Sequence, residues 1–291
     1  MSNISISQLL ASAVAKFPQS DLSIKHDLQM IICDVLDVDK TYLYLNSDKQ
    51  LDKVTLTKIN RKILRLLVGE PLAYILGYKY FWNQKLYVTK DTLIPRADTE
   101  AVVAAVLDDI QDKNARLKIL DLGTGSGAIA LALAEELPNS QVVAVDLYSK
   151  TLDVAKKNAQ ANNIANVEFM QSSWYQSLEE TKFDIIVSNP PYIDIEDANV
   201  DDSVRQHEPS RALFATDNGL ADIRIIISQA SDFLKQGGYL YIEHGFTQAN
   251  DIAIIFSQYG FGDIQTIKDL NNKDRCTKAR LGSYTNPNTN S

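Results

Sequence analysis

Four consecutive residues, Asn189-Pro190-Pro191-Tyr192, follow an apolar segment and could together bind a planar amine. Residues 183–187 predict a buried strand, which must end at the prolines because proline has no N–H for the ladder. Two acceptors then stand at the strand's end, the side-chain oxygen of Asn189 and the main-chain oxygen of Pro190, and Tyr192 adds a flat ring. This combination suits a conjugated –NH₂ group, whereas the simplest alternative is a strand stop with a buried tyrosine.

A glycine-rich stretch, DLGTGSG at 121–127, stands between a predicted strand and a predicted helix. Glycine lets the backbone turn tightly, and the helix amino terminus presents free N–H groups to a ligand. Asp146 ends the next predicted strand, where a carboxylate can accept hydrogen bonds from ribose hydroxyls. Together these features predict a nucleoside-containing cofactor, although a glycine run alone could be a packing turn. The loop residues expected to hold it are Gly123, Thr124, Gly125, Ser126 and Gly127.

The spacing of this loop favours S-adenosylmethionine over a dinucleotide. Its glycines follow G-x-G-x-G, not the G-x-G-x-x-G of dinucleotide sites. Asp121 stands two positions before the first glycine, and its carboxylate would repel a pyrophosphate but suit the ammonium group of S-adenosylmethionine. Trp174, after the third predicted strand, could be a platform for adenine or an ordinary core tryptophan.

A methyl donor beside the 189–192 tip predicts methyl transfer to a planar amine. Such a nitrogen is a poor nucleophile, so positioning by Asn189 and Pro190 matters more than a base. We assign Asn189, Pro190 and Tyr192 to catalysis and the whole tip, Pro191 included, to substrate binding; Asn189 also lies near the cofactor. No metal is expected, since the three histidines and two cysteines form no ligand cluster.

Apolar strands that alternate with helical segments predict an α/β fold, a parallel sheet covered by helices on both faces. In such sheets ligands bind beyond the carboxyl ends of the strands, where the residues above stand. The expected strands are 117–123, 141–146, 167–172, 183–189 and 237–245, with edge strands near 263–270 and 275–282. The expected helices between them are 127–137, 149–163 and 219–236.

The first 75 residues predict helices, because their apolar residues recur at helical spacing around 6–17, 28–36 and 56–67. Pro18 and Gly69 are the expected stops. Aromatic and β-branched residues then surround an Asn83-Gln84 turn, which predicts a hairpin. The expected parts are a helical substrate-recognition domain at 1–75, a hairpin linker at 76–95, a catalytic domain at 96–283 and a disordered tail at 284–291.

Composition is that of a globular protein, with 45% hydrophobic and 23% charged residues among 291. Residues 1–80 hold ten Lys/Arg against eight Asp/Glu, a balance of +2, and the remainder of the net −8 is −10. An acidic catalytic region argues against tight, nonspecific DNA binding. No membrane segment or signal peptide is apparent, so a cytoplasmic location is expected. Lys58, Arg61, Lys62 and Arg65 share one face of the third helix, either solvated or a partner patch.

The chain resembles the peptide chain release factor glutamine methyltransferases (PrmC/HemK family) almost from end to end. The segments that carry the resemblance are PLAYILGYKYF, TLIPRADTE, ILDLGTGSGAIALALA, VVAVD, SSW, FDIIVSNPPYI, VRQHEPSRAL and EHG. The resemblance implies a class I methyltransferase domain with a mostly parallel seven-stranded sheet. It also implies methylation of the glutamine amide in the Gly-Gly-Gln motif of class I release factors, which modulates translation termination. The NPPY tetrad alone would equally fit a DNA or RNA exocyclic-amine methyltransferase.

The sequence departs from the family pattern at three positions. Ala97 stands where proline is usual, Ser173 where an acidic residue is common, and His207 where phenylalanine is frequent. The absent acidic residue leaves the adenine amino group to find another partner. Other polar candidates have weaker assignments: Arg96, Thr99 and Glu100 in a loop that could close over the cofactor or start a helix, and Arg205 and Glu208 near the glutamine entrance or paired together.

Overall fold

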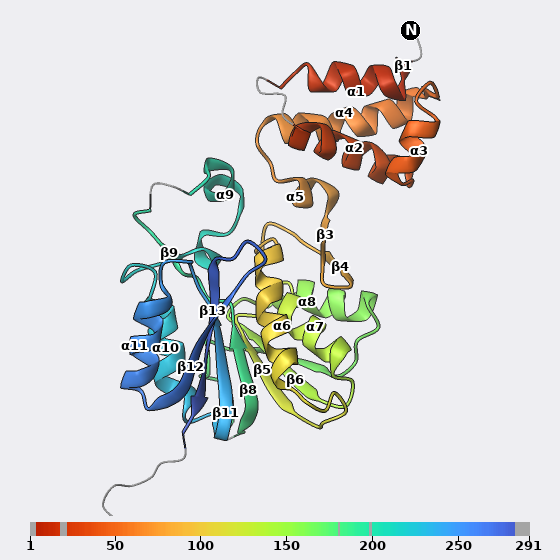
Figure 1. The fold of residues 1–291 in the computed structure, drawn as a ribbon. Coiled ribbons are helices and arrows are strands. Elements are labelled where there is room, and N and C mark those ends of the chain that lie inside the picture. The colour runs from red at the N-terminus through yellow and green to blue at the C-terminus, as the bar shows by residue number, and fades with distance from the viewer. Residues whose placement is uncertain (1–3, 18–21, 180, 198–199, 283–291) are drawn as a thin grey trace, which may run out of the picture. The chain divides into compact units, whose positions relative to one another are not determined.

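The computed structural model describes residues 4–17, 22–179, 181–197 and 200–282, and the chain divides into two compact units (Figure 1). The helical unit comprises Met1–Gly77 and Asp202–His207, and the sheet unit comprises Tyr78–Asp201 and Glu208–Ser291. The predicted tail at 284–291 and the predicted stop at Pro18 lie outside the described residues. Within the described part, no helix has the length and apolar character needed to cross a bilayer.

The helical unit closes around its own apolar core. Its elements are β1 (Ile4–Ser5), α1 (Ile6–Val14), α2 (Leu22–Leu36), α3 (Lys40–Leu45), β2 (Gln50–Leu51), α4 (Lys53–Leu67), α5 (Leu72–Leu76) and α9 (Asp202–His207). Side-chain caps begin three of the helices: Ser5 accepts from the Gln8 N–H, Asp39 from the Tyr42 N–H, and Asp52 from the N–H groups of Val54 and Thr55. The three helices predicted from apolar spacing are confirmed as α1, α2 and α4. The helices α3 and α5 are too short, at 6 and 5 residues, to give a readable period.

The predicted basic face of α4 is only partly free. Lys62 pairs with Asp34 at 2.8 Å and donates to the Ile75 carbonyl, so its charge is used within the helical unit. Arg65 pairs with Glu70. Lys58 and Arg61 remain exposed.

The predicted hairpin is confirmed as β3 (Tyr78–Phe81) and β4 (Gln84–Tyr87), but its turn is one residue earlier than expected, at Trp82-Asn83. Gln84 is unsuited to a turn because its side chain is buried. It donates to the Leu131 carbonyl at 3.1 Å and to Glu135, and so attaches the hairpin to the sheet unit.

The sheet unit is built on seven strands in the order β12-β13-β11-β8-β5-β6-β7. Five neighbouring strands are parallel, and only β13 runs antiparallel, to both β11 and β12. The strands are β5 (Lys118–Leu122), β6 (Gln141–Asp146), β7 (Val167–Gln171), β8 (Phe183–Ser188), β11 (Leu234–Glu243), β12 (Phe261–Lys268) and β13 (Asp274–Leu281). The predicted α/β fold with a mostly parallel seven-stranded sheet is therefore confirmed.

Helices cover both faces of this sheet (Figure 1). One face packs α6 (Glu100–Asp109), α7 (Ala128–Glu136) and α8 (Ser149–Ala161), and the other packs α10 (Ala221–Ala230) and α11 (Ala249–Gln258). The shorter elements are η1 (Ala97–Thr99), β9 (Ile193–Asp194), η2 (Ser210–Ala212) and β10 (Phe214–Ala215). The predicted helix at 219–236 is wrong at its end, because α10 stops at Ala230 and Leu234 already pairs with Phe183 in the sheet.

Strand register brings three chain segments to the same level at one edge. Ser188 of β8 pairs with Leu122 of β5 on one side and with Ile242 of β11 on the other. The residues that follow them, Gly123, Asn189 and Glu243, therefore meet at the carboxyl edge of the sheet.

Candidate active site

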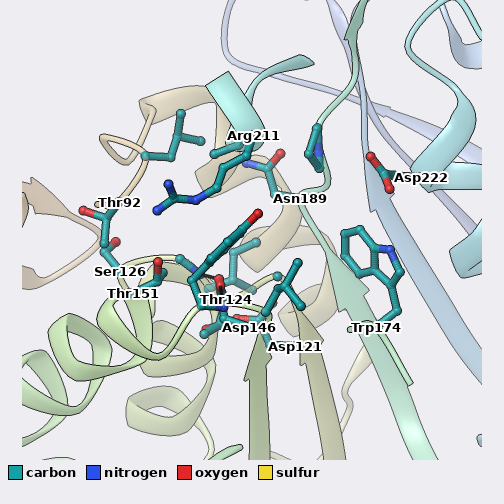
Figure 2. A pocket seen from close by; sticks show the side chains of 18 of the residues that line it. Thr92, Asp121, Thr124, Ser126, Asp146, Thr151, Trp174, Asn189, Arg211 and Asp222 are labelled. Atoms are coloured by element: carbon teal, nitrogen blue, oxygen red, sulfur yellow. Dashed lines mark hydrogen bonds between the residues drawn. The ribbon is translucent and has the colours of Figure 1, made fainter. Parts of the chain in front are cut away.

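A cavity of about 560 Å³ lies at this carboxyl edge, within the sheet unit (Figure 2). Its volume is in the range of small-molecule sites. The predicted site residues that line it are Gly123, Thr124, Gly125, Ser126, Asp146, Trp174, Asn189 and Pro191. Gly127, Pro190 and Tyr192 are not among its lining residues.

The glycine loop needs its glycines for two different reasons. Gly123 and Gly125 have φ values of +72° and +59°, and a Cβ on Gly123 would come within 3.3 Å of the Trp174 ring. Gly127, with φ +88°, is needed for packing, because its Cβ would meet Leu131 at 3.1 Å. Gly123 and Gly125 therefore present bare backbone to the cavity, and side chains at these positions would occupy part of it.

Two buried carboxylates support the loop. Asp121 accepts from the Thr124 hydroxyl at 2.6 Å, and burial raises the pKa of its carboxyl to about 7. Asp146 accepts from the N–H groups of Gly125 at 3.1 Å and Tyr148 at 3.0 Å. Burial raises the pKa of Asp146 as well, against the effect of these hydrogen bonds. Each oxygen of Asp146 retains room for a further donor, as binding of two ribose hydroxyls requires.

Asp222 is a cavity residue that the sequence reasoning missed. It belongs to the first turn of α10 and lines the cavity beside Trp174, opposite the side where Thr92 and Arg211 lie (Figure 2). Burial raises the pKa of its carboxyl, and a hydrogen bond from the Trp174 indole opposes that shift. No local motif marks Asp222; the one signal in the sequence is the missing acidic residue at Ser173, which also lines the cavity.

The 189–192 tip is held by side chains from three other segments. Asn189 donates its Nδ2 hydrogen to Thr99 Oγ1 at 3.3 Å, and the Tyr192 hydroxyl donates to Glu243 Oε1 at 3.4 Å. Gln248 Nε2 donates to the Tyr192 carbonyl at 2.9 Å. Burial raises the pKa of Tyr192 above its ordinary value, so its hydroxyl stays protonated.

The weaker candidates have structural partners. Arg96 lines the cavity and pairs with Glu208 at 2.5 Å, and Glu208, which is 5% exposed, also accepts from the Ile94 N–H. Glu100 begins α6 and accepts from the Trp82 N–H at 2.9 Å. Arg205 belongs to α9 in the helical unit. Among the described residues, no group of His, Cys, Asp and Glu is arranged to hold a metal ion.

Comparisons with known proteins agree with this architecture. Residues 113–277 match the family model of a methyltransferase domain, and residues 8–77 match that of the PrmC N-terminal domain. The chain is 78% identical to a release factor glutamine methyltransferase of Francisella tularensis subsp. tularensis, over 97% of this chain and 99% of that protein. It is 42% identical to a protein of the same name from Vibrio cholerae, over 97% of this chain and 98% of the relative.

Among solved structures, the chain is similar to a methyltransferase from Pyrococcus furiosus. The TM-score is 0.53 at 19% identity, over 77% of this chain and 99% of the other. At this identity the likeness concerns the fold alone.

Proposed function

The chain belongs to the release factor glutamine methyltransferases, and we propose that its cavity and 189–192 tip methylate the side-chain amide nitrogen of a glutamine. The acceptor is the glutamine of the Gly-Gly-Gln motif in class I peptide chain release factors, whose methylation modulates translation termination. The single observation that carries the site assignment is the meeting of Gly123 and Asn189 at one sheet edge. This meeting supports a cofactor site at the loop beside the two acceptor oxygens of the tip.

S-adenosylmethionine supplies an electrophilic methyl group when it is bound. The donor set of the cavity fits this molecule: bare backbone at the glycine loop, two acceptor oxygens on Asp146 for ribose, and the Trp174 ring for adenine. Asp121 provides negative charge for the ammonium group. We assign to Asp222 the acceptor for the adenine amino group, the role left open by Ser173.

Asn189 and Pro190 position the acceptor nitrogen. An amide nitrogen is a weak nucleophile because its lone pair is delocalised. It becomes positively charged as its bond to the methyl group forms and the sulfur–methyl bond breaks, and it then loses one of its two hydrogens as a proton to water. The Asn189 side-chain oxygen and the Pro190 carbonyl oxygen would each accept one of its two hydrogens. These oxygens stabilise the charge that develops on nitrogen more than they stabilise the neutral amide, and so they lower the barrier. Positioning of this kind is worth several of the ~7–11 kcal/mol available from orientation.

Tyr192 is not a lining residue of the cavity, but its contacts fix the conformation of the tip. Its hydroxyl is engaged by Glu243 and its carbonyl by Gln248, which hold the ring in one orientation. The ring then provides a flat side for the glutamine amide, together with Pro191, which lines the cavity.

A methyl-transfer assay tests this function. The full chain is incubated with labelled S-adenosylmethionine and either a class I release factor, the same factor with its Gly-Gly-Gln glutamine replaced, or DNA. We expect label only on the unmodified factor. Label on DNA, or label that persists after glutamine replacement, would refute the assignment and favour the exocyclic-amine alternative.

The acidic balance of the chain supports the protein substrate. Residues beyond 80 carry a net charge of −10, whereas nonspecific nucleic-acid binding requires many cations. We place the enzyme in the cytoplasm, because its substrate acts in translation there.

A further inference from the structure

A buried glutamate, Glu243, lies beside the catalytic tip; its Oε1 accepts from the Tyr192 hydroxyl, and its Oε2 has no role in the chemistry described above. It ends β11, is 1% exposed, and its Oε2 has no hydrogen-bond partner among the described residues. Burying a carboxylate costs several kcal/mol unless other groups compensate. Its position one residue beyond Ile242, level with Asn189, suggests that its charge is used at the tip.

Strand alternation turns Glu243 and Asn189 toward the same helix. Val187 and Tyr241 share the core cluster that contains α6, so the residues two positions later face the same side of the sheet. Thr99, which directly precedes α6, stands there. Asn189 donates to its Oγ1 at 3.3 Å, and the nearby Thr99 hydroxyl lowers the pKa of the Glu243 carboxyl.

We propose that Glu243 is a positioning residue that fixes the orientation of the Asn189 amide through Thr99. A threonine hydroxyl has one hydrogen, and Glu243 takes it, because an ionised carboxylate only accepts. Thr99 Oγ1 can then only accept from Asn189, which selects the orientation with Nδ2 toward Thr99. The Asn189 oxygen is thereby left for the substrate N–H. The reverse orientation would set an –NH₂ group against the substrate –NH₂ group and lose the hydrogen bond.

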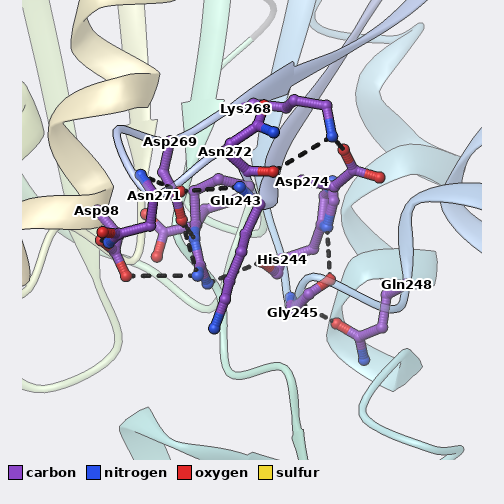
Figure 3. Close-up of polar contacts among 12 residues, drawn as sticks. Asp98, Glu243, His244, Gly245, Gln248, Lys268, Asp269, Asn271, Asn272 and Asp274 are labelled. Atoms are coloured by element: carbon purple, nitrogen blue, oxygen red, sulfur yellow. Dashed lines mark hydrogen bonds and ion pairs between the residues drawn. The ribbon is translucent and has the colours of Figure 1, made fainter.

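The surroundings of Glu243 leave it ionised, and so an acceptor, above about pH 7. Burial raises the pKa of its carboxyl to about 7, while Thr99, Arg275 and Tyr192 lower it and Asp98 raises it. Arg275 of β13 is itself fixed by Asp269 at 3.1 Å and by Asp98 at 3.3 Å. These contacts join the turn between β12 and β13 to η1, next to Glu243 (Figure 3).

Paired substitutions at Thr99 test the relay, which rests on the proposed function. T99V keeps the shape but removes the hydroxyl, and we expect kcat for release factor to fall about tenfold or more, the worth of one charge-assisted hydrogen bond. KM for release factor and the Kd for S-adenosylmethionine, measured by calorimetry, should change less than about threefold on the same scale. The conservative T99S should restore most of the turnover. E243Q should lower kcat like T99V. Its amide group can donate to Thr99, so the Thr99 hydroxyl could donate to Asn189 and the orientation of the Asn189 amide would no longer be fixed.

A matched control is T277V. Thr277 lies on β13, pairs with Ile242 of β11, and has a buried hydroxyl that contacts His244. The substitution should leave kcat unchanged even if it lowers the unfolding midpoint. A T99V protein that folds and turns over like wild type would overturn the relay. So would a T99V loss that T99S does not restore and that weakened cofactor binding accompanies, since this indicates a purely structural role. The proposed function itself fails only if the wild-type chain does not methylate the glutamine.

Discussion

Asparagine at position 189 brings a requirement that a carboxylate would not. Its side chain carries an acceptor and a donor that differ only by a rotation, and only the acceptor can bind the substrate –NH₂ group. The site therefore has to specify the orientation of this amide as well as its place. Thr99 does so in the structure by accepting from Nδ2.

The Asn189→Ala variant measures what this amide contributes. Removal of the oxygen takes away an interaction that strengthens in the transition state, and the loss of one such preorganised group costs roughly 10²–10³-fold in kcat. The Kd for S-adenosylmethionine, obtained by calorimetry, should rise by less than about tenfold, because the loop and Asp146 remain. Turnover at the wild-type rate would refute the assigned role.

Asp222 provides a second prediction, on cofactor selectivity. If its carboxylate accepts from the adenine amino group, wild-type protein should bind S-adenosylhomocysteine about tenfold more tightly than an analogue with hypoxanthine in place of adenine. Asp222→Asn should reduce this preference to near unity in a calorimetric titration. Asp217→Asn is the control, because Asp217 pairs with Arg224 at 2.6 Å and is not among the cavity residues. A preference that survives in Asp222→Asn assigns the amino group to another partner.

At the scale of elements, the sequence predicted the parts of the site that are contiguous and missed those that are not. The glycine loop and the tip can each be recognised from seven residues or fewer, because a run of glycines or a pair of prolines determines the local backbone. Asp222 and Glu243 carry no such local mark. Glu243 belongs to the EHG segment, and its proximity to Asn189 follows only from strand register and alternation.

The same reasoning explains the errors in the fold. The sequence indicated α6 only as a possible helix start at Thr99 and Glu100, because apolar residues occupy most of its ten positions and hide its period. The end of α10 was misplaced because the chain continues with apolar residues into β11. There a bulge between Leu234 and Tyr239 interrupts the pairing and the two-residue period.

A glycine outside the cofactor loop is predicted to hold the tip in place. Gly219 has φ +80°, and a Cβ there would lie 2.0 Å from the Tyr192 carbonyl oxygen. Gly219→Ala should lower the free energy of unfolding by at least ~3 kcal/mol and reduce turnover, because the Tyr192 backbone must move. Gly260→Ala is matched in φ, at +78°, but meets nothing within 4 Å, so it should cost only ~1–2 kcal/mol and leave kcat unchanged. Urea unfolding and turnover are the measurements, and equal effects of the two variants would contradict the argument.

At the scale of the whole molecule, the two units have separate cores and different electrostatics. In the helical unit the carboxyl groups with shifted pKa values are shifted downward. The ion pair with Arg65 lowers the pKa of Glu70, and the Thr55 hydroxyl lowers that of Asp52. The sheet unit instead buries Asp121 and Glu243, whose pKa values rise to about 7. Two units with their own cores need not unfold together, so a probe is needed that reports one of them.

Tryptophan fluorescence is such a probe, because the chain's 2 tryptophans, Trp82 and Trp174, both belong to the sheet unit. Below about pH 7 the cofactor-free sheet unit retains protons on Asp121 and Glu243 that the unfolded chain has lost, and above it both groups are ionised, the form in which they serve the ammonium group and the relay. Their contribution to stability is therefore present at low pH and is lost as pH rises through about 7. Between about pH 6.5 and 8.5, the cofactor-free protein should lose roughly 1 kcal/mol of unfolding free energy per group. His244, whose pKa burial lowers, opposes the trend only at the lower edge of this window, where the unfolded chain still binds a proton at this residue. In urea unfolding followed by tryptophan emission, Asp121→Asn should lose about half of this pH dependence, because one of the two groups no longer titrates. A wild-type stability that is flat or rises over the same range would show that the two carboxyls are ionised throughout, and would remove the electrostatic distinction between the units.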